Sequence, residues 1–241
     1  MRSLHLAALV LLANSLPTRS QNLLGDGSFE EPKVAGRTAR EANGNPALAT
    51  VSPWAGFSFT GEASAGRLSA GMTNEIARTG TQSLYLDFEK LTGSSPKVAL
   101  VTKLIPIQPQ QPYRISIWGR IDPKRPLALD ERRPVMGLNI EFFTPEKRVI
   151  AEETTQGAQP IPGNIIPGGP HNLVFLSRKW SESFARVTTP ANAAFVQVTW
   201  AWEIPGATGE TDGVVFWDDA ALEHEAQPPV APSGGAPAAT K

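Results

Sequence analysis

Two adjacent carboxylates interrupt an apolar stretch near the end of this chain of 241 residues. The sequence reads GVVFWDDAALE over residues 213–223, so Asp218 and Asp219 stand where a buried strand is expected. Burying an ionised carboxylate without a partner is costly, and water, a basic side chain or a metal ion can compensate it. The stretch therefore marks a position where something must stabilise a charge.

The alternation of side chains along a strand gives one indication of where Asp218 points. In an unbulged strand it shares its face with an otherwise apolar set, namely Val214, Phe216, Ala220 and Leu222. If that face is the core, Asp218 points inward near the rim and requires a cation. The alternative is that Asp218 caps backbone amides or pairs with an arginine such as Arg78, and a β-bulge would change the assignment.

The elements that must position these groups are short strands, because apolar and polar residues alternate with a period of two. The clearest runs are QSLYLDF (82–88), PYRISIWGR (112–120), VMGLNIEFF (135–143) and AFVQVTWAWE (194–203). Further strands are expected near residues 28–31, 56–60, 66–72, 97–105, 148–152, 173–177 and 184–188. About ten strands separated by turn residues predict an all-β fold, a two-sheet antiparallel β-sandwich of the jelly-roll type.

The two ends of the chain differ in composition from the middle. Residues 1–20 combine a basic start, a short apolar core and a polar exit, which is the pattern of a secretory signal peptide. Residues 21–226 form the predicted sandwich domain, with a long Gly- and Pro-rich loop at 154–172, and residues 227–241 form a Pro/Ala-rich disordered tail. We expect a cleaved protein that is secreted or periplasmic.

Charge and composition exclude several classes of partner. Without residues 1–20 the chain has 20 basic and 23 acidic residues, which leaves no basic footprint for nucleic acid. No later segment is apolar and long enough to span a membrane, and the chain has no cysteine.

Five motifs in order along the chain resemble one family. They are NLLGDGSFEE (22–31), the tryptophan at 54, TGTQSLYL (79–86), YRISIWGR (113–120) and FWDDAAL (216–222). Together they resemble the CenC-like carbohydrate-binding modules of families 4 and 9, within the galactose-binding-like jelly rolls. Ala220 departs from the pattern, which usually has a larger aliphatic residue there, and the chain is longer in its loops.

The resemblance implies a structural calcium ion. In many such modules the first and last strands lie side by side, and a Ca²⁺ held by acidic side chains and backbone carbonyls ties them together. Carried over to this chain, the side-chain ligands would be Glu30 and Asp218, with Glu31 and Asp26 as weaker alternatives. Calcium accepts carboxylate and carbonyl oxygens in irregular loops.

The resemblance also implies a sugar site on an outer face or at a rim of the sandwich. Such a site needs a flat aromatic ring and polar groups for the hydroxyls. The candidates are side chains that the alternation predicts to point outward from the strands. They are Trp118, Arg120, Asn139, Glu141, Gln197, Glu203 and Tyr85. Trp200 and Trp202 have the phase of the core, and the long loop covering Trp118 is the alternative to a site there.

The functional prediction is non-catalytic binding of a polysaccharide or oligosaccharide. The chain lacks the common hydrolase motifs, and its two histidines outside the signal, His171 and His224, lie in the loop and near the tail. The alternative is a structural or adhesive extracellular protein without a sugar site, and a glycan-active hydrolase or lyase is a third reading.

Overall fold

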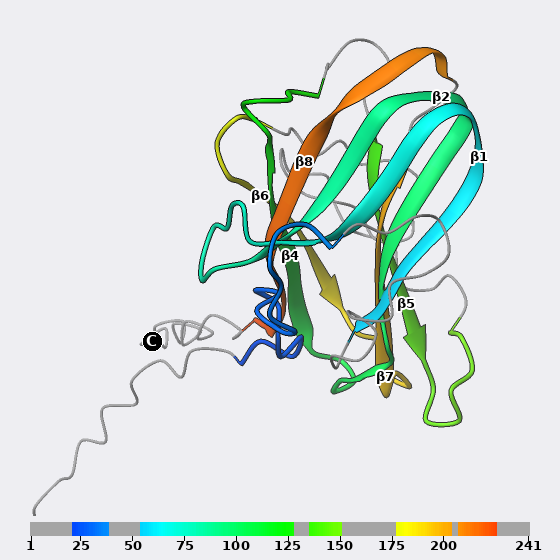
Figure 1. Cartoon of the computed structure of the whole chain (residues 1–241). Coiled ribbons are helices and arrows are strands. Elements are labelled where there is room, and N and C mark those ends of the chain that lie inside the picture. The colour runs from blue at the N-terminus through cyan, green and yellow to red at the C-terminus, as the bar shows by residue number, and fades with distance from the viewer. Residues whose placement is uncertain (1–20, 39–53, 128–134, 151–176, 204–206, 226–241) are drawn as a thin grey trace, which may run out of the picture.

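The computed structural model describes residues 21–38, 54–127, 135–150, 177–203 and 207–225. The predicted signal peptide, the loop at 154–172 and the tail at 227–241 lie outside these residues. Within the described residues the chain forms eight strands (Figure 1). Their bounds are β1 (Trp54–Thr73), β2 (Ser83–Thr102), β3 (Ile105–Pro106), β4 (Pro112–Ile121), β5 (Val135–Phe143), β6 (Ser181–Thr188), β7 (Phe195–Glu203) and β8 (Ala207–His224).

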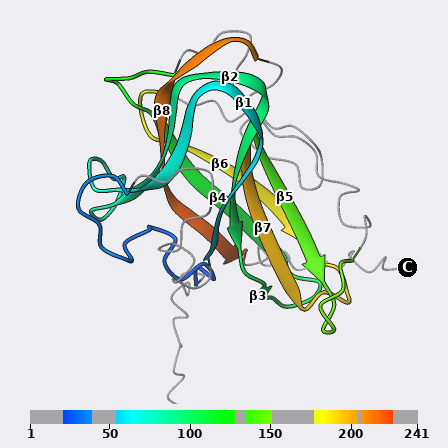
Figure 2. The same ribbon diagram turned by 45° about the vertical axis from the view of Figure 1, so that its right-hand side comes forward.

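The strands pair antiparallel in the order β3-β7-β2-β8-β4-β6, with β1 also on β2 and β5 also on β7. The long strands β1 and β2 arch over one end of the molecule and enter both layers (Figures 1 and 2). The first half of β2 pairs with β8, and its second half pairs with β7. One layer therefore contains β8, β4 and β6, and the other contains β7, β5 and β3, which confirms the predicted β-sandwich.

The bend in β1 and β2 is made by irregular pairing. The register between them shifts three times between Thr60 and Arg67. Gly66 has φ +78°, and a Cβ there would lie 2.2 Å from the carbonyl oxygen of Lys90, so only glycine fits this corner. Such bulges increase the local twist and let one ribbon turn from one layer to the next.

The core lies between the two layers and is rich in tryptophan. Trp202 of β7 and Trp217 of β8 face each other across the sandwich with ring centroids 5.0 Å apart. Trp54 packs between Phe29 and Trp200 at centroid distances of 5.0 and 6.0 Å. Trp200 and Trp202 are buried, as their strand phase predicts.

Some predicted strands differ from the structure. Residues 56–60 and 66–72 are parts of the single strand β1, because the pairing with β2 continues through the bulged segment between them. Residues 28–31 are not a strand. Of the strand predicted at 148–152, the described residues form only one isolated bridge, between Phe143 and Val149. The 173–177 prediction falls almost wholly outside the described residues.

The start of the described chain runs beside β8, close to the end of the sequence. Asn22 forms an antiparallel bridge with Glu223, the amide of Leu23 donates to the carbonyl of Leu222, and the amide of Ala220 donates to Gly27. The neighbouring first and last segments implied by the resemblance are thus present.

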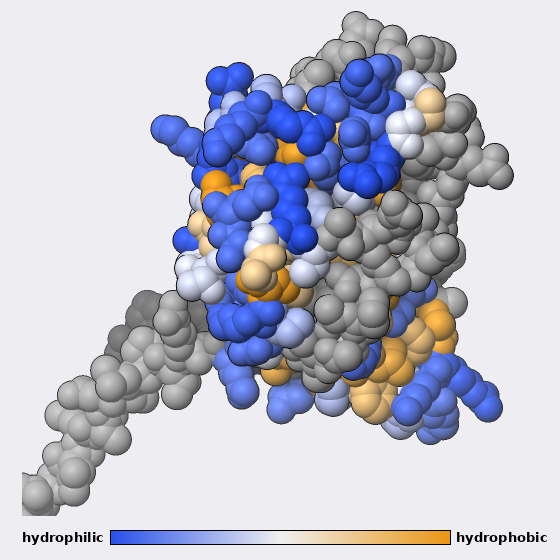
Figure 3. All heavy atoms as spheres, in the orientation of Figure 1, coloured by the Kyte–Doolittle hydropathy of each residue, from blue (hydrophilic) through white to orange (hydrophobic). Residues whose placement is uncertain are grey.

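Where the structure describes it, the surface in the orientation of Figure 1 is largely hydrophilic, with apolar atoms in small separate areas (Figure 3). The described residues include no helix with the length and apolar character needed to cross a membrane.

Candidate functional site

A β-bulge in β8 lies at the two adjacent aspartates. Trp118 of β4 pairs with Asp218, but Ser116 pairs with Ala221, so β8 has one extra residue here. Asp219 takes a positive φ of 47° at this point. The bulge shifts the alternation of side chains by one residue. Before the bulge Val215 and Trp217 face the core, and after it Ala220 and Leu222 face the core.

The prediction that Asp218 shares one face with Val214, Phe216, Ala220 and Leu222 was therefore wrong, because the bulge places two of these four residues on each side of the layer. Val214 and Phe216 belong to a separate apolar cluster with Tyr85, on the outside of the β8 layer. Ala220 and Leu222 belong to the main core. Asp218 is nevertheless fully buried, since the segment around Arg78 lies over it.

Backbone amides satisfy the buried carboxylate of Asp218. Its Oδ2 accepts from the amides of Arg78 at 2.7 Å and Thr79 at 3.2 Å, and its Oδ1 accepts from the amide of Asp219 at 2.7 Å. Burial raises the pKa of Asp218 to about 7, while these amides favour the charged form. Of the two alternatives left open by the sequence, the geometry matches the capping of amides.

Glu30 holds the other end of the same turn. Its Oε1 accepts from the amides of Thr81 at 2.8 Å and Gln82 at 3.1 Å, and Lys33 pairs with its Oε2 at 2.7 Å. Burial opposes ionisation, yet the hydrogen bonds from Lys33 and Thr81 lower the pKa of Glu30 to about 2. Asp218 and Glu30 thus hold residues 78–82 from both sides.

This arrangement does not fit a calcium site. Calcium requires six to eight oxygen ligands, whereas the predicted ligands Glu30 and Asp218 face N–H donors. Asp26 likewise accepts from the amides of Glu30 and Glu31. Among the described residues no three His, Cys, Asp or Glu side chains gather to hold a metal. The calcium ion stays a prediction that nothing in this geometry supports.

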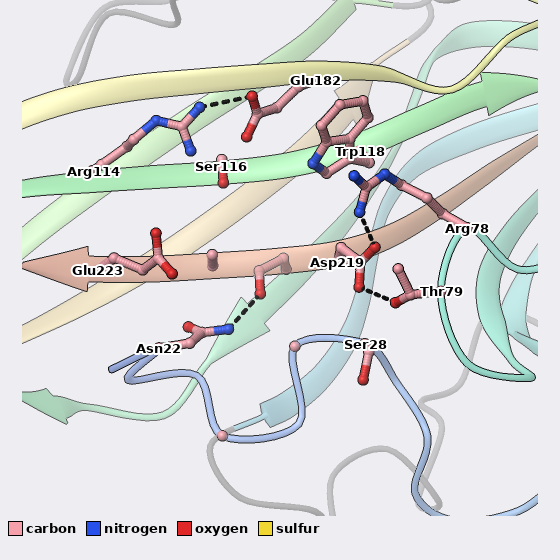
Figure 4. Close-up of a pocket in the computed structure, with 14 residues that line it drawn as sticks. Asn22, Ser28, Arg78, Thr79, Arg114, Ser116, Trp118, Glu182, Asp219 and Glu223 are labelled. Carbon is pink, nitrogen blue, oxygen red and sulfur yellow. Dashed lines mark hydrogen bonds and ion pairs between the residues drawn. The ribbon is translucent and has the colours of Figure 1, made fainter. Parts of the chain in front are cut away.

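Asp219 connects the turn to the outer face of the sheet. Its Oδ2 pairs with the guanidinium of Arg78, and its Oδ1 accepts from the hydroxyl of Thr79 at 2.5 Å. The guanidinium carbon of Arg78 lies 3.7 Å above the centroid of the Trp118 ring. Figure 4 shows this stack at one end of a groove.

The groove has a volume of about 470 Å³ and runs over β4 and β8. At its other end Arg114 pairs with Glu182 of β6 at 2.7 Å. The N-terminal segment forms one wall (Figure 4). The lining residues are Asn22, Gly25, Gly27, Ser28, Arg78, Thr79, Arg114, Ser116, Trp118, Glu182, Asp219, Ala220, Ala221 and Glu223.

The predicted sugar-binding residues do not form one site. Trp118 alone lines the groove. Arg120 lies on the same outer face but stacks on Trp180, with its guanidinium carbon 5.7 Å from that ring centroid. Tyr85 is buried under Arg37, and its hydroxyl donates to the carbonyl of Thr38 at 3.2 Å.

The remaining candidates lie on the opposite layer. Asn139 and Glu141 are on β5, and Gln197 is on β7, where its amide donates to the carbonyl of Thr102 at 2.9 Å. Glu203 ends β7, and its side chain lies outside what the structure describes. The period of two separates inward from outward residues, but it does not say to which layer a strand belongs.

Sequence reasoning missed most of the groove. Arg114 and Ser116 share the outward phase of Trp118 on β4, and that signal could have found them. Arg78, Glu182 and Glu223 come from a turn and two other strands, so only the sheet order brings them to Trp118.

Comparison with known proteins gives structural likeness at low identity. No protein-family model matches the chain. No curated protein matches it either. Among solved structures, the CBM22-1 xylan-binding domain of Paenibacillus barcinonensis Xyn10C is 12% identical at a TM-score of 0.39, with 85% of this chain and 95% of that chain covered.

Two other similar structures have different descriptions. A Stig cyclase, Fisc, from Fischerella sp. TAU is 10% identical at a TM-score of 0.48, with 84% of this chain and 96% of that one covered. The enzymatically active domain of bacteriophage CBA120 tailspike protein 4 is 11% identical at a TM-score of 0.43 over 72% of this chain. This chain covers 20% of the length of that domain. At these identities the likeness concerns strand arrangement and assigns no ligand or reaction.

Proposed function

We propose that this protein binds a carbohydrate in the groove beside Trp118, without catalysing a reaction. The observation that carries the proposal is the groove itself, an open polar hollow with an aromatic ring at one end (Figure 4). Guanidinium, carboxylate and hydroxyl groups line it, and these are the groups that bind sugar hydroxyls. The signal-like residues 1–20 support export, so the expected ligand is an extracellular polysaccharide or oligosaccharide.

The pairing of the charged groups supports binding rather than catalysis. A glycoside hydrolase uses two carboxylates on either side of the scissile bond, one of them a proton donor. In the groove Asp219 pairs with Arg78 and Glu182 pairs with Arg114, so an arginine of the protein already engages each of these carboxylates. Carboxylates held in this way can accept hydrogen bonds from sugar hydroxyls.

Trp118 can stack on a sugar ring only if the Arg78 guanidinium moves away from the indole or leaves part of the indole face open. The guanidinium now covers one face of the indole at 3.7 Å, and its pairing with Asp219 keeps it there. A sugar ring that displaced it would gain aromatic contact and release a cation toward the ligand hydroxyls. This covered ring is also the specific observation in favour of the second candidate, a structural or adhesive protein without a sugar site.

A glycan array with residues 21–241 decides between the two. We expect binding that Trp118→Ala reduces about fivefold or more, since about 1–3 kcal/mol of stacking and cation contact would be lost. The matched control is Asn139→Ala with Glu141→Ala, which truncates the opposite outer face and should leave binding unchanged. Loss of binding in the control alone would move the site to the β5–β7 face. An array without any bound glycan would favour the structural role.

A further inference from the structure

The charged groups of the groove do not balance. Its lining has two arginines, Arg78 and Arg114, against three carboxylates, Asp219, Glu182 and Glu223. Each arginine forms an ion pair, Arg78 with Asp219 and Arg114 with Glu182. Each also stacks on an aromatic ring, Arg78 on Trp118 at 3.7 Å and Arg114 on Phe184 at 4.5 Å. Both cations are therefore engaged before any ligand arrives.

Glu223 is the carboxylate left over. It lies on β8 directly opposite Arg114 of β4, but the Arg114 guanidinium pairs with Glu182 on the other side. Within the described part of the chain, the Glu223 carboxylate has no hydrogen bond and no ion pair. It is partly exposed and lines the groove, so its charge is available to a ligand (Figure 4).

A second polar group in the groove also lacks a partner. Ser116 lies on β4 between Arg114 and Trp118, and it is only 3% exposed. Its hydroxyl points into the groove, and no described residue forms a hydrogen bond with it (Figure 4). The hydroxyl oxygen is open to solvent from the groove, so a ligand that reaches Ser116 replaces water there with a hydrogen bond of its own.

From these observations we infer that the groove selects a glycan bearing a free amino group, an amino-sugar polymer, over neutral and acidic glycans. The inference depends on the carbohydrate binding proposed above. The ammonium group pairs with Glu223, and neighbouring hydroxyls bond to Ser116. A carboxylate or sulfate on the ligand meets a net negative groove whose arginines are already paired.

The selection is testable with three oligomers of equal length. Calorimetric titration of the protein, residues 21–241, would compare a β-1,4-glucosamine hexamer, its N-acetylated form and a galacturonate hexamer. One exposed charge pair corresponds to about fivefold in affinity, so we expect the amine to bind about fivefold more tightly than the acetylated form. The galacturonate hexamer should bind most weakly, and added salt should reduce the preference.

Glu223→Gln and Glu210→Gln provide the matched pair of variants. Glu223→Gln should abolish the preference for the amine while binding of the acetylated hexamer persists. Glu210→Gln removes an exposed charge from the same strand outside the groove and should keep the preference. Equal affinity for both hexamers, or a preference that survives Glu223→Gln, would overturn the inference but leave sugar binding intact. Failure of all glycans to bind would overturn both.

Discussion

At the scale of single residues, Asp218 makes the fold sensitive to pH. Burial raises its pKa from 3.8 to about 7, so the folded state holds a proton that the unfolded chain releases. The stability that this proton provides is complete below about pH 4. It is lost as pH rises through 7.

Replacing Asp218 by Asn tests this dependence. The amide oxygen of Asn can still accept from Arg78 and Thr79, but the side chain does not titrate. We expect a thermal melting temperature that changes less between pH 4 and 8 in the variant than in the wild type. Equal pH profiles for the two proteins would show that Asp218 is ionised throughout.

Glu30 has the opposite dependence at the other end of the turn. Its pKa of about 2 lies below the ordinary 4.5, so its contribution is present above pH 4.5 and lost as pH falls through 2. Two carboxylates thus hold the turn at 78–82. The contribution of Glu30 to stability is lost in strong acid, and the contribution of Asp218 declines toward neutral pH.

At the scale of elements, the turn at 78–82 depends on a glycine. Gly80 has φ +63°, and a Cβ there would lie 2.1 Å from Oε1 of Glu30. Gly80→Ala should therefore cost about 1–3 kcal/mol, since it adds a clash to the backbone strain. Chemical denaturation measures the change in the free energy of unfolding.

Gly36 offers a matched control for that substitution. It has a similar φ of +76°, but nothing lies within 4 Å of the Cβ that alanine would add. Gly36→Ala should cost about 1 kcal/mol from backbone strain alone. If both variants lose the same stability, the contact with Glu30 has no energetic role.

The strands were predictable from sequence, and their assignment to layers was not. Alternation located β4, β5 and β7 within a few residues, because each buries one face and exposes the other. The bulge at Asp219 was not predictable, since its positive φ depends on contacts with the turn at 78–82. Trp118 was found because it lies on a regular strand. Arg78 was considered as a partner of Asp218, but its stacking on Trp118 was not predicted, because a turn has no periodicity.

At the scale of the whole molecule, β1 and β2 make the two layers one unit. β2 pairs with β8 in one layer and with β7 in the other, and β1 pairs along β2. The Trp202–Trp217 contact joins the layers through the core. We expect cooperative unfolding, with tryptophan fluorescence and far-ultraviolet circular dichroism following the same denaturant transition. Two separated transitions would mean that the layers unfold independently.

The N-terminal segment also has a consequence for handling the protein. Asn22, Gly25, Gly27 and Ser28 line the groove, and this segment bonds to β8, so Gln21 stands at the margin of the proposed ligand surface. A tag or fused domain joined directly before Gln21 would crowd the approach of a long polymer. Display or immobilisation through that end therefore calls for an extended flexible spacer.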